Sequence, residues 1–329
     1  MDRIYTGLSD MECCMLCPRK CSVDRRSDSA SSKTGVCGQT EKIKIARAAL
    51  HYWEEPCISG KNGSGAVFFS GCSLKCVFCQ NREISAGGFG KEISIGRLAD
   101  IFLELQKKGA ENINLVTPTH FIPQIRAALD MVRADLKLPV VYNSSGYESV
   151  ESLKLLAGYI DIYLPDFKYA DKGLAAELSK AGDYPECAVL AIDEMVRQIS
   201  KRHRPEGCHS EGICSFDDRG MMRCGVIVRH LVLPGHVRNS KEVLDMLYKR
   251  YNNTLYYSIM NQYTPSSLTN PGTSKIMEKY PELKRKLTER EYEKVIDYAL
   301  ELGIERAYIQ EGGTAGESFI PAFDLEGVE

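Results

Sequence analysis

The chain has 329 residues, of which 43% are hydrophobic and 26% are charged. Such a composition can bury a large core, and α/β barrels of ~250 residues routinely form a single domain. The net charge of −2 gives no support for a nucleic-acid partner, which would favour a clustered basic surface. No apolar run approaches the ~18 residues of a membrane span, and the first ten residues lack the order of a signal peptide.

Thirteen cysteines are the main compositional signal. Without a secretion signal they do not indicate a disulfide framework. In a reducing compartment, closely spaced cysteines are more typical of metal ligands or catalytic thiols. The sequence therefore predicts a cytoplasmic protein with at least one metal centre.

Residues 1–65 are rich in cysteine and are predicted to form a small N-terminal lobe. Four thiols there could satisfy a tetrahedral zinc or an iron site, and Pro18 and Gly38 favour the tight turns of such sites. The alternative is a set of free structural thiols. The predicted second metal site consists of Cys14, Cys17, Cys21 and Cys37.

Residues 66–265 alternate short apolar runs with longer amphipathic ones. The predicted strands are Ala66–Ser70, Asn112–Thr117, Pro139–Asn143, Ile160–Leu164, Val226–Val232 and Leu255–Met260. The helical patterns between them include Ile95–Lys108, Ile122–Asp135, Val150–Ala157 and Lys241–Tyr251. Strand, helix and strand at this spacing predict βαβ units, and thus an α/β fold in which six parallel strands form a partial barrel or a curved open sheet.

Two further segments depart from this rhythm. His203–Gly220 is polar and contains Cys208 and Cys214, and we expect it to be an exposed loop or lid. Residues 266–329 are predicted to be a C-terminal extension that packs on the barrel. It contains one strong helix, Glu289–Leu302, and a short apolar run, Arg306–Ile309.

The segment that follows the first predicted strand carries three cysteines, Cys72, Cys76 and Cys79. Thiolates at this spacing on one loop can hold three corners of an iron–sulfur cube, and the fourth iron then stays open to a small chelator. Gly71 gives the loop entry conformational freedom. The alternatives are inert buried cysteines, or a zinc site completed elsewhere, although zinc prefers paired CxxC knuckles.

This CxxxCxxC pattern, with Phe78 before its last cysteine, resembles the signature of radical S-adenosylmethionine (SAM) enzymes. Gln80-Asn81 narrows the resemblance toward activases of glycyl-radical enzymes. Four strand-end segments are similar to those of PflX-like proteins, which are relatives of pyruvate formate-lyase activating enzyme and are near the AmmeMemoRadiSam proteins. These segments are Asn114–His120, Tyr142–Tyr147, Asp161–Lys168 and Arg229–Gly235.

The resemblance implies a partial (β/α)6 barrel that binds a [4Fe–4S] cluster and SAM. Reductive cleavage of SAM would give a 5′-deoxyadenosyl radical, which abstracts hydrogen from a protein, peptide or amino-acid substrate. The enzyme could be a glycyl-radical activase or a peptide-modifying enzyme, and its electron donor would be of the flavodoxin or ferredoxin type. The protein contributes positioning and exclusion of water.

The resemblance also implies a set of SAM contacts. Phe78 should lie against the adenine, and Thr117-Pro118-Thr119 replaces the GGE segment that usually binds the methionine amino group. Asn143 stands where the activating enzyme has an aspartate beside a monovalent cation. The alternative is that these residues are satisfied polar groups at strand ends. The implied SAM-binding residues are Phe78, Thr117, Thr119, Asn143, Ser144, Asp166, Lys168 and Arg229.

Tyr263, at the end of the sixth predicted strand, is the one candidate catalytic residue. It would contact substrate or relay a radical, unless it is an ordinary tyrosine of the barrel lip. The rival function is an iron–sulfur or zinc electron-transfer protein that does not use SAM. Such a carrier would supply a fourth cysteine near the triplet, and the sequence has none between Cys79 and Cys187.

Overall fold

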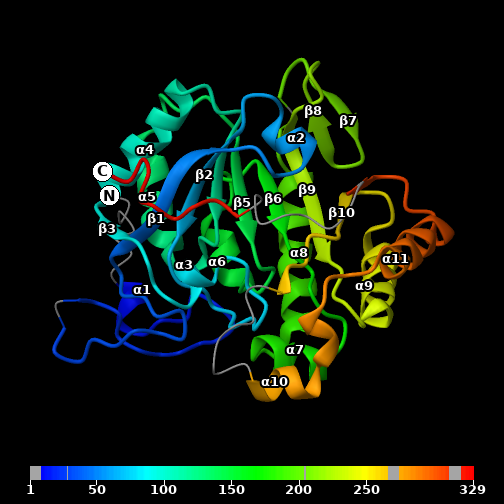
Figure 1. The fold of residues 1–329 in the computed structure, drawn as a ribbon. Coiled ribbons are helices and arrows are strands. Elements are labelled where there is room, and N and C mark those ends of the chain that lie inside the picture. Colours follow the sequence, from blue (N-terminus) through cyan, green and yellow to red (C-terminus); the bar gives the residue numbers. More distant parts are fainter. Residues whose placement is uncertain (1–8, 28, 204, 266–273, 311–319) are drawn as a thin grey trace.

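The computed structural model describes residues 9–27, 29–203, 205–265, 274–310 and 320–329. Within these ranges one sheet runs in the order β11-β10-β9-β6-β5-β4-β2-β1-β3 (Figure 1). Neighbouring strands from β2 to β11 pair in parallel. These parallel strands are β2 (Ser64–Phe69), β4 (Ile113–Val116), β5 (Val140–Ser144), β6 (Ile162–Pro165), β9 (Met222–Leu231), β10 (Tyr256–Met260) and β11 (Ala307–Ile309). The predicted α/β fold with a parallel sheet is confirmed, and β11 extends it beyond the six expected strands.

Helices connect the parallel strands, as the βαβ pattern predicts. Ser94 caps the first of them by accepting a hydrogen bond from the amide of Arg97. That helix buries residues at i, i+3, i+4 and i+7, which gives it one apolar face; they are Leu98, Ile101, Phe102 and Leu105. The connecting helices are α4 (Ile95–Lys107), α5 (Ile122–Met131), α6 (Val150–Leu155), α7 (Lys172–Ser179), α8 (Tyr184–Ser200), α9 (Val237–Tyr251) and α11 (Glu289–Leu302).

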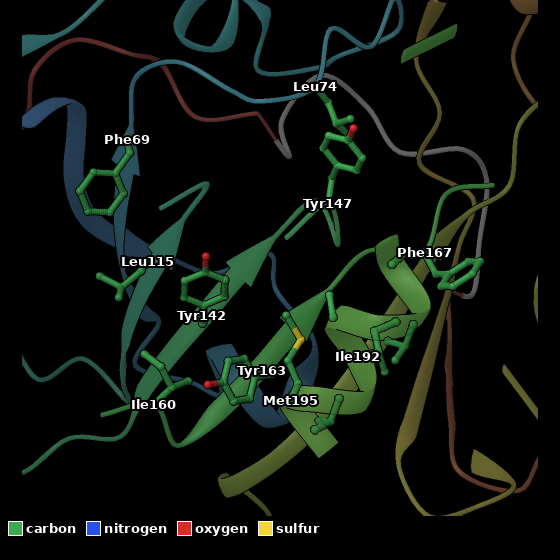
Figure 2. Packing of buried hydrophobic residues seen from close by; sticks show 14 of the residues in the cluster. Phe69, Leu74, Leu115, Tyr142, Tyr147, Ile160, Tyr163, Phe167, Ile192 and Met195 are labelled. Carbon is green, nitrogen blue, oxygen red and sulfur yellow. The ribbon is translucent and has the colours of Figure 1, made fainter. Parts of the chain in front are cut away.

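Both faces of the sheet are buried, which explains why its strands read as continuous apolar runs. Tyr142 and Tyr163 point toward the helix layer, where they belong to one cluster with Ile192 and Met195 of α8 (Figure 2). Their neighbours in the strands belong to a second, smaller cluster on the other face of the sheet. Those residues are Val141, Ile162 and Leu164.

The sequence analysis did not predict one long strand. β1 (Ile43–His51) pairs antiparallel with β2 and with the edge strand β3 (Lys91–Ile93). The chain end runs along β1, where the amide of Leu325 donates to the carbonyl of Ala46. The boundary predicted at residue 65 therefore falls inside β2, which pairs with β1 in the same sheet.

The segment predicted as a loop at His203–Gly220 instead contains a hairpin. β7 (His209–Glu211) pairs with β8 (Cys214–Phe216), which pairs antiparallel with the first residues of β9. Cys214 is buried there because it packs in the smaller core cluster. The hairpin therefore extends the sheet.

Short helices complete the described structure. Of the predicted C-terminal extension, residues 266–273 and 311–319 lie outside the described residues. In the part of the chain that is described, no helix is both long and apolar enough to cross a membrane. The short helices are α1 (Ser9–Glu12), α2 (Pro56–Ser59), α3 (Arg82–Ser85), η1 (Thr119–Phe121), α10 (Ser274–Lys279) and η4 (Pro281–Lys284).

Candidate functional site

A cavity lies at the carboxyl ends of the parallel strands, where ligand sites of such sheets form. Its volume is about 1210 Å³, including the space open to solvent. Residues that follow β2, β4, β5 and β6 line it, together with residues at the ends of β9 and β10. The sheet thus brings together side chains that are almost 200 positions apart in sequence, such as Cys72 and Gln262.

Cys72, Cys76 and Cys79 all line this cavity, and we call them the cavity thiols. Their loop turns at Gly71, whose φ is +88°. A Cβ there would lie 2.7 Å from the carbonyl oxygen of Cys37, so only glycine fits. Two main-chain bonds hold the loop to the end of α7: Lys75 donates to Ser179 and Val77 to Leu178.

Each cavity thiol has a hydrogen-bonding partner. The amide of Leu74 donates to the Cys72 sulfur. The hydroxyl of Ser179 donates to Cys76 Sγ over 2.9 Å, and Ser85 Oγ lies 3.2 Å from Cys79 Sγ. Hydrogen bonds to sulfur are one of the means by which a protein tunes an iron–sulfur cluster.

Burial makes the cavity thiols hard to ionise when nothing is bound. It raises the pKa of Cys72 far above the ordinary value, and Cys76 and Cys79 raise it further. It raises the pKa of Cys76 to about 11, although the ammonium of Lys168 opposes the shift. A positively charged metal group would stabilise the thiolates that this site needs.

A charged network forms another part of the cavity wall. Arg229 donates from Nε to Asp166 Oδ1 over 3.0 Å, from Nη1 to Glu54 Oε2 over 3.0 Å, and from Nη2 to Asn143 Oδ1 over 2.5 Å. Lys168 Nζ donates to the other oxygen of Asp166 over 2.5 Å. Three strand ends and the segment after β1 are therefore joined by one guanidinium.

The network controls the charge of its carboxylates. Burial alone would raise the pKa of Asp166, but Lys168 and Arg229 outweigh it and hold that pKa below its usual value. The neighbouring Glu55 differs, because burial raises its pKa and the charge of Glu54 adds to the effect, although Arg229 opposes it. Among the described residues, its Oε2 has no hydrogen-bond partner. The surroundings thus stabilise the ionised form of Asp166 and oppose ionisation of Glu55.

Seven of the eight residues expected to bind SAM line the cavity: Phe78, Thr117, Asn143, Ser144, Asp166, Lys168 and Arg229. Thr119 differs from expectation, since it is buried and donates to Glu148 Oε1 over 2.9 Å. Tyr263 also differs. Its ring packs against Phe78 at 6.3 Å, and its hydroxyl donates to the carbonyl of Leu283 over 2.6 Å. A buried hydroxyl needs a partner, and this one is satisfied by the main chain and is not available to the cavity.

Sequence reasoning missed three lining residues that follow or end β1: His51, Trp53 and Glu54. Glu54 is central, because it accepts hydrogen bonds from Asn114, Asn143 and Arg229. The available signal was a pair of carboxylates, Glu54 and Glu55, directly before Pro56 and the first predicted strand.

Comparison with known proteins decides the family. Residues 66–247 match the model of the Radical SAM superfamily. The chain belongs to the radical SAM superfamily. It is also 30% identical over 305 residues to the uncharacterized protein MJ0674 of Methanocaldococcus jannaschii, an alignment that covers 90% of this chain and 76% of that protein. Membership of the superfamily means that this radical SAM protein uses a [4Fe–4S] cluster and SAM.

Solved structures resemble this radical SAM chain at low identity. SuiB of Streptococcus suis bound to the precursor peptide SuiA aligns at a TM-score of 0.46 and 16% identity, over 73% of this chain and 46% of that one. A cysteine-to-serine mutant of spore photoproduct lyase aligns at 0.45 and 13%, over 74% of each chain. The chain spans about half the length of SuiB.

The cavity fits the cofactor that the superfamily uses. Among the described residues, no group of three or more His, Cys, Asp or Glu side chains is arranged to hold a metal ion. A single zinc ion would draw its thiolates to ~2.3 Å from one centre, whereas a cube gives each thiolate its own iron. Three thiols on one loop that line the cavity are ligands of the type that iron–sulfur clusters take.

Proposed function

We propose that the cavity thiols bind the [4Fe–4S] cluster and leave its fourth iron open to SAM. The supporting observation is the donor set: among the described residues, three cysteines and no fourth line the cavity. Each of the three sulfurs also has a hydrogen-bonding partner. A carrier of electrons alone would close the fourth corner with a protein ligand.

The residues around the thiols would bind and orient SAM. Phe78 would lie against the adenine, and its ring is held from behind by Tyr169 and Tyr263 at 6.4 and 6.3 Å. When bound, the reduced cluster supplies the electron that cleaves SAM to methionine and a 5′-deoxyadenosyl radical. The cavity wall would keep this radical away from water.

The charged network would position the methionine end of SAM. Lys168, whose ammonium lies near enough to Cys76 to lower its pKa, would attract the SAM carboxylate toward the cluster. Arg229 would act with it, while its bonds to Glu54 and Asp166 hold the guanidinium in place. Thr117, with φ of +60°, would offer its hydroxyl and carbonyl to the amino group. Thr119 is not part of this proposal, because its hydroxyl is bonded to Glu148.

The substrate we propose is a protein, peptide or amino acid, from which the radical abstracts hydrogen. The resemblance to PflX-like proteins supports this class, with activation of a glycyl-radical enzyme as its most specific form and peptide modification as the second form. A flavodoxin- or ferredoxin-type protein would supply electrons in the cytoplasm. The thirteen cysteines, all free thiols, fit a reducing compartment.

Anaerobic reconstitution with iron and sulfide, followed by dithionite and SAM, tests the assignment through the formation of 5′-deoxyadenosine. Replacing Cys72, Cys76 and Cys79 together by alanine should reduce this product to background. Cys187→Ala is the matched control, because Cys187 lies on α8 outside the cavity lining, and it should leave the product unchanged. Product that persists in the triple variant would refute the site.

A further inference from the structure

The four N-terminal cysteines lie close together, although sixteen positions separate Cys37 from Cys21 in the sequence. Cys14, Cys17 and Cys37 are buried, with exposed fractions of 6%, 9% and 8%. A Cβ on Gly35 would touch the sulfurs of both Cys21 and Cys37, at 3.5 and 3.6 Å. No disulfide joins them. We call Cys14, Cys17, Cys21 and Cys37 the N-terminal thiol group.

The positions of the four thiols allow them to act together. Three of them are buried, and the sulfurs of Cys21 and Cys37 both lie next to Gly35. Thiols grouped in this way can serve as ligands of a shared positive centre.

Two sulfurs of the group accept hydrogen bonds. Arg25 Nη1 donates to Cys14 Sγ over 3.5 Å, and the amide of Val36 donates to Cys21 Sγ over 3.3 Å. Such bonds would stabilise thiolates that bind a metal group.

The number and type of ligands indicate which metal groups the site suits. Four cysteine thiolates complete the coordination of one tetrahedral zinc ion or of a [4Fe–4S] cluster. Of the two, only the cluster can exchange electrons. A cluster with four protein ligands has no open iron for SAM.

The chain segments that carry the two thiol sites pack against each other. The carbonyl oxygen of Cys37 lies so close to Gly71, which precedes Cys72, that a Cβ there would approach it to 2.7 Å. Arg19, two residues beyond Cys17, donates through Nε to the carbonyl of Ser73 over 2.8 Å. One non-bonded contact, between the Cys37 carbonyl and Gly71, and the covalent bonds of the chain therefore connect Cys37 to Cys72.

The N-terminal thiol group lies next to residues that reach the solvent. Met15 and Val36 follow and precede Cys14 and Cys37 in the sequence and are 47% and 42% exposed. The cavity thiols instead line the cavity. A donor protein could therefore approach the N-terminal thiol group from outside the cavity.

We propose that the N-terminal thiol group holds a second [4Fe–4S] cluster, which passes single electrons from a donor protein to the cluster of the cavity thiols. In each step the donor protein loses one electron to the cluster of the N-terminal thiol group, which we call the outer cluster. The outer cluster is then reoxidised as it reduces the cluster of the cavity thiols, the inner cluster. No bond is made or broken. The existence of the outer cluster does not depend on the proposed function, but its role as a relay does.

Iron content of the reconstituted full-length chain tests the site itself. The wild type should hold about eight irons, since each cluster contains four. The cavity triple variant, Cys72, Cys76 and Cys79→Ala, should keep about four, with an electron paramagnetic resonance signal on reduction by dithionite. Cys13→Ser, next to the group but exposed, should keep about eight as the matched control. A cavity triple variant without iron, or a wild type with about four irons and one zinc, would overturn the proposal.

A donor comparison tests the relay. The rate of 5′-deoxyadenosine formation with a reduced flavodoxin is divided by the rate with dithionite, which reaches centres without docking. In the Cys17→Ser/Cys37→Ser double variant this ratio should fall at least about tenfold. An unchanged ratio would overturn the relay. A wild type with eight irons that makes no product with either reductant would instead refute the proposed function and leave the second cluster standing.

Discussion

The two thiol sites of this chain differ in the number of ligands and in their surroundings. The cavity thiols are three, come from one loop, and face an arginine, a lysine and two carboxylates. The N-terminal thiol group has four members from two segments, and two of its sulfurs accept hydrogen bonds, one from Arg25 and one from the amide of Val36. A centre with three ligands and nearby side-chain charges can bind a substrate, whereas a centre with four ligands is closed.

The same contrast appears in how each site is held. Arg229 organises the cavity through side chains, which must keep their charges paired. Arg25 organises the N-terminal site through main-chain carbonyls of Gln39, Thr40 and His120. One site therefore depends on electrostatic balance, and the other depends on chain conformation.

Removal of Arg229 should have the largest effect on stability. Arg229→Leu leaves Glu54 and Asp166 buried with less compensation, which costs about 3–5 kcal/mol for a buried pair. Urea unfolding of the reconstituted protein measures the loss. The matched control is Arg238→Leu, which breaks an exposed pair with Glu242 and should change stability by less than about 0.5 kcal/mol. Equal losses in the two variants would show that the cavity does not depend on paired charge.

Lowering the pH should destabilise the folded protein through the buried side chain of His120. His120 donates through Nε2 to the carbonyl of Ser70, and burial lowers its pKa to about 3. This folded-state pKa lies below the unfolded value of ~6.5. The contribution of His120 to stability is therefore complete above pH ~6.5 and is lost as the pH falls toward 3. From pH 7 to pH 5 the free energy of unfolding should decrease by about 2 kcal/mol because of this histidine.

The comparison that isolates this histidine is His120→Gln, which should remove that part of the pH dependence of unfolding. His230 is expected to retain its own acid response in the variant, since burial lowers its pKa to about 4. His209→Gln changes an exposed histidine and should follow the wild type. Parallel curves for wild type and His120→Gln would contradict the assignment.

The smallest expected effect concerns the tuning of the cavity thiols. Ser179→Ala removes the hydroxyl that donates to Cys76 Sγ, a contribution of about 1 kcal/mol to the reduced state. The midpoint potential of the cavity cluster should become more negative by about 40 mV in a one-electron couple. The potential is measured by redox titration in the Cys17→Ser/Cys37→Ser background, which is expected to carry the cavity cluster alone. The exposed Ser200→Ala in the same background is the control. An unchanged potential would mean that the serine only positions the loop.

Local patterns in the sequence were sufficient for much of the fold. The helix at Glu289–Leu302 was predicted with its observed bounds, and in the structure Thr288 and Glu291 form a capping box at its start. The six apolar runs became parallel strands, since a strand buried on both faces needs no alternation. The spacing of the cavity thiols also required only one loop.

Other features depend on contacts between distant segments. β1 alternates weakly in sequence and became a strand by pairing with β2. Thr119 and Tyr263 were expected in the cavity, yet each hydroxyl found a buried acceptor elsewhere, Glu148 and the carbonyl of Leu283. Sequence position places a residue near a strand end, but it does not decide which way the side chain turns.

The sequence by itself determined the superfamily signature, the α/β class and the three cavity thiols with seven of their polar and aromatic neighbours in the cavity, because these follow from local spacing and from the rule that strand ends meet at one edge. Only the tertiary structure decided that Glu54 completes the charged network and that Cys37 touches the loop of Cys72. Both depend on β1, an antiparallel strand that folds back on β2 and carries the segments at its two ends to the cavity and to the cluster loop. The local sequence of β1 does not specify this long-range pairing, because strand formation depends on the neighbouring strand.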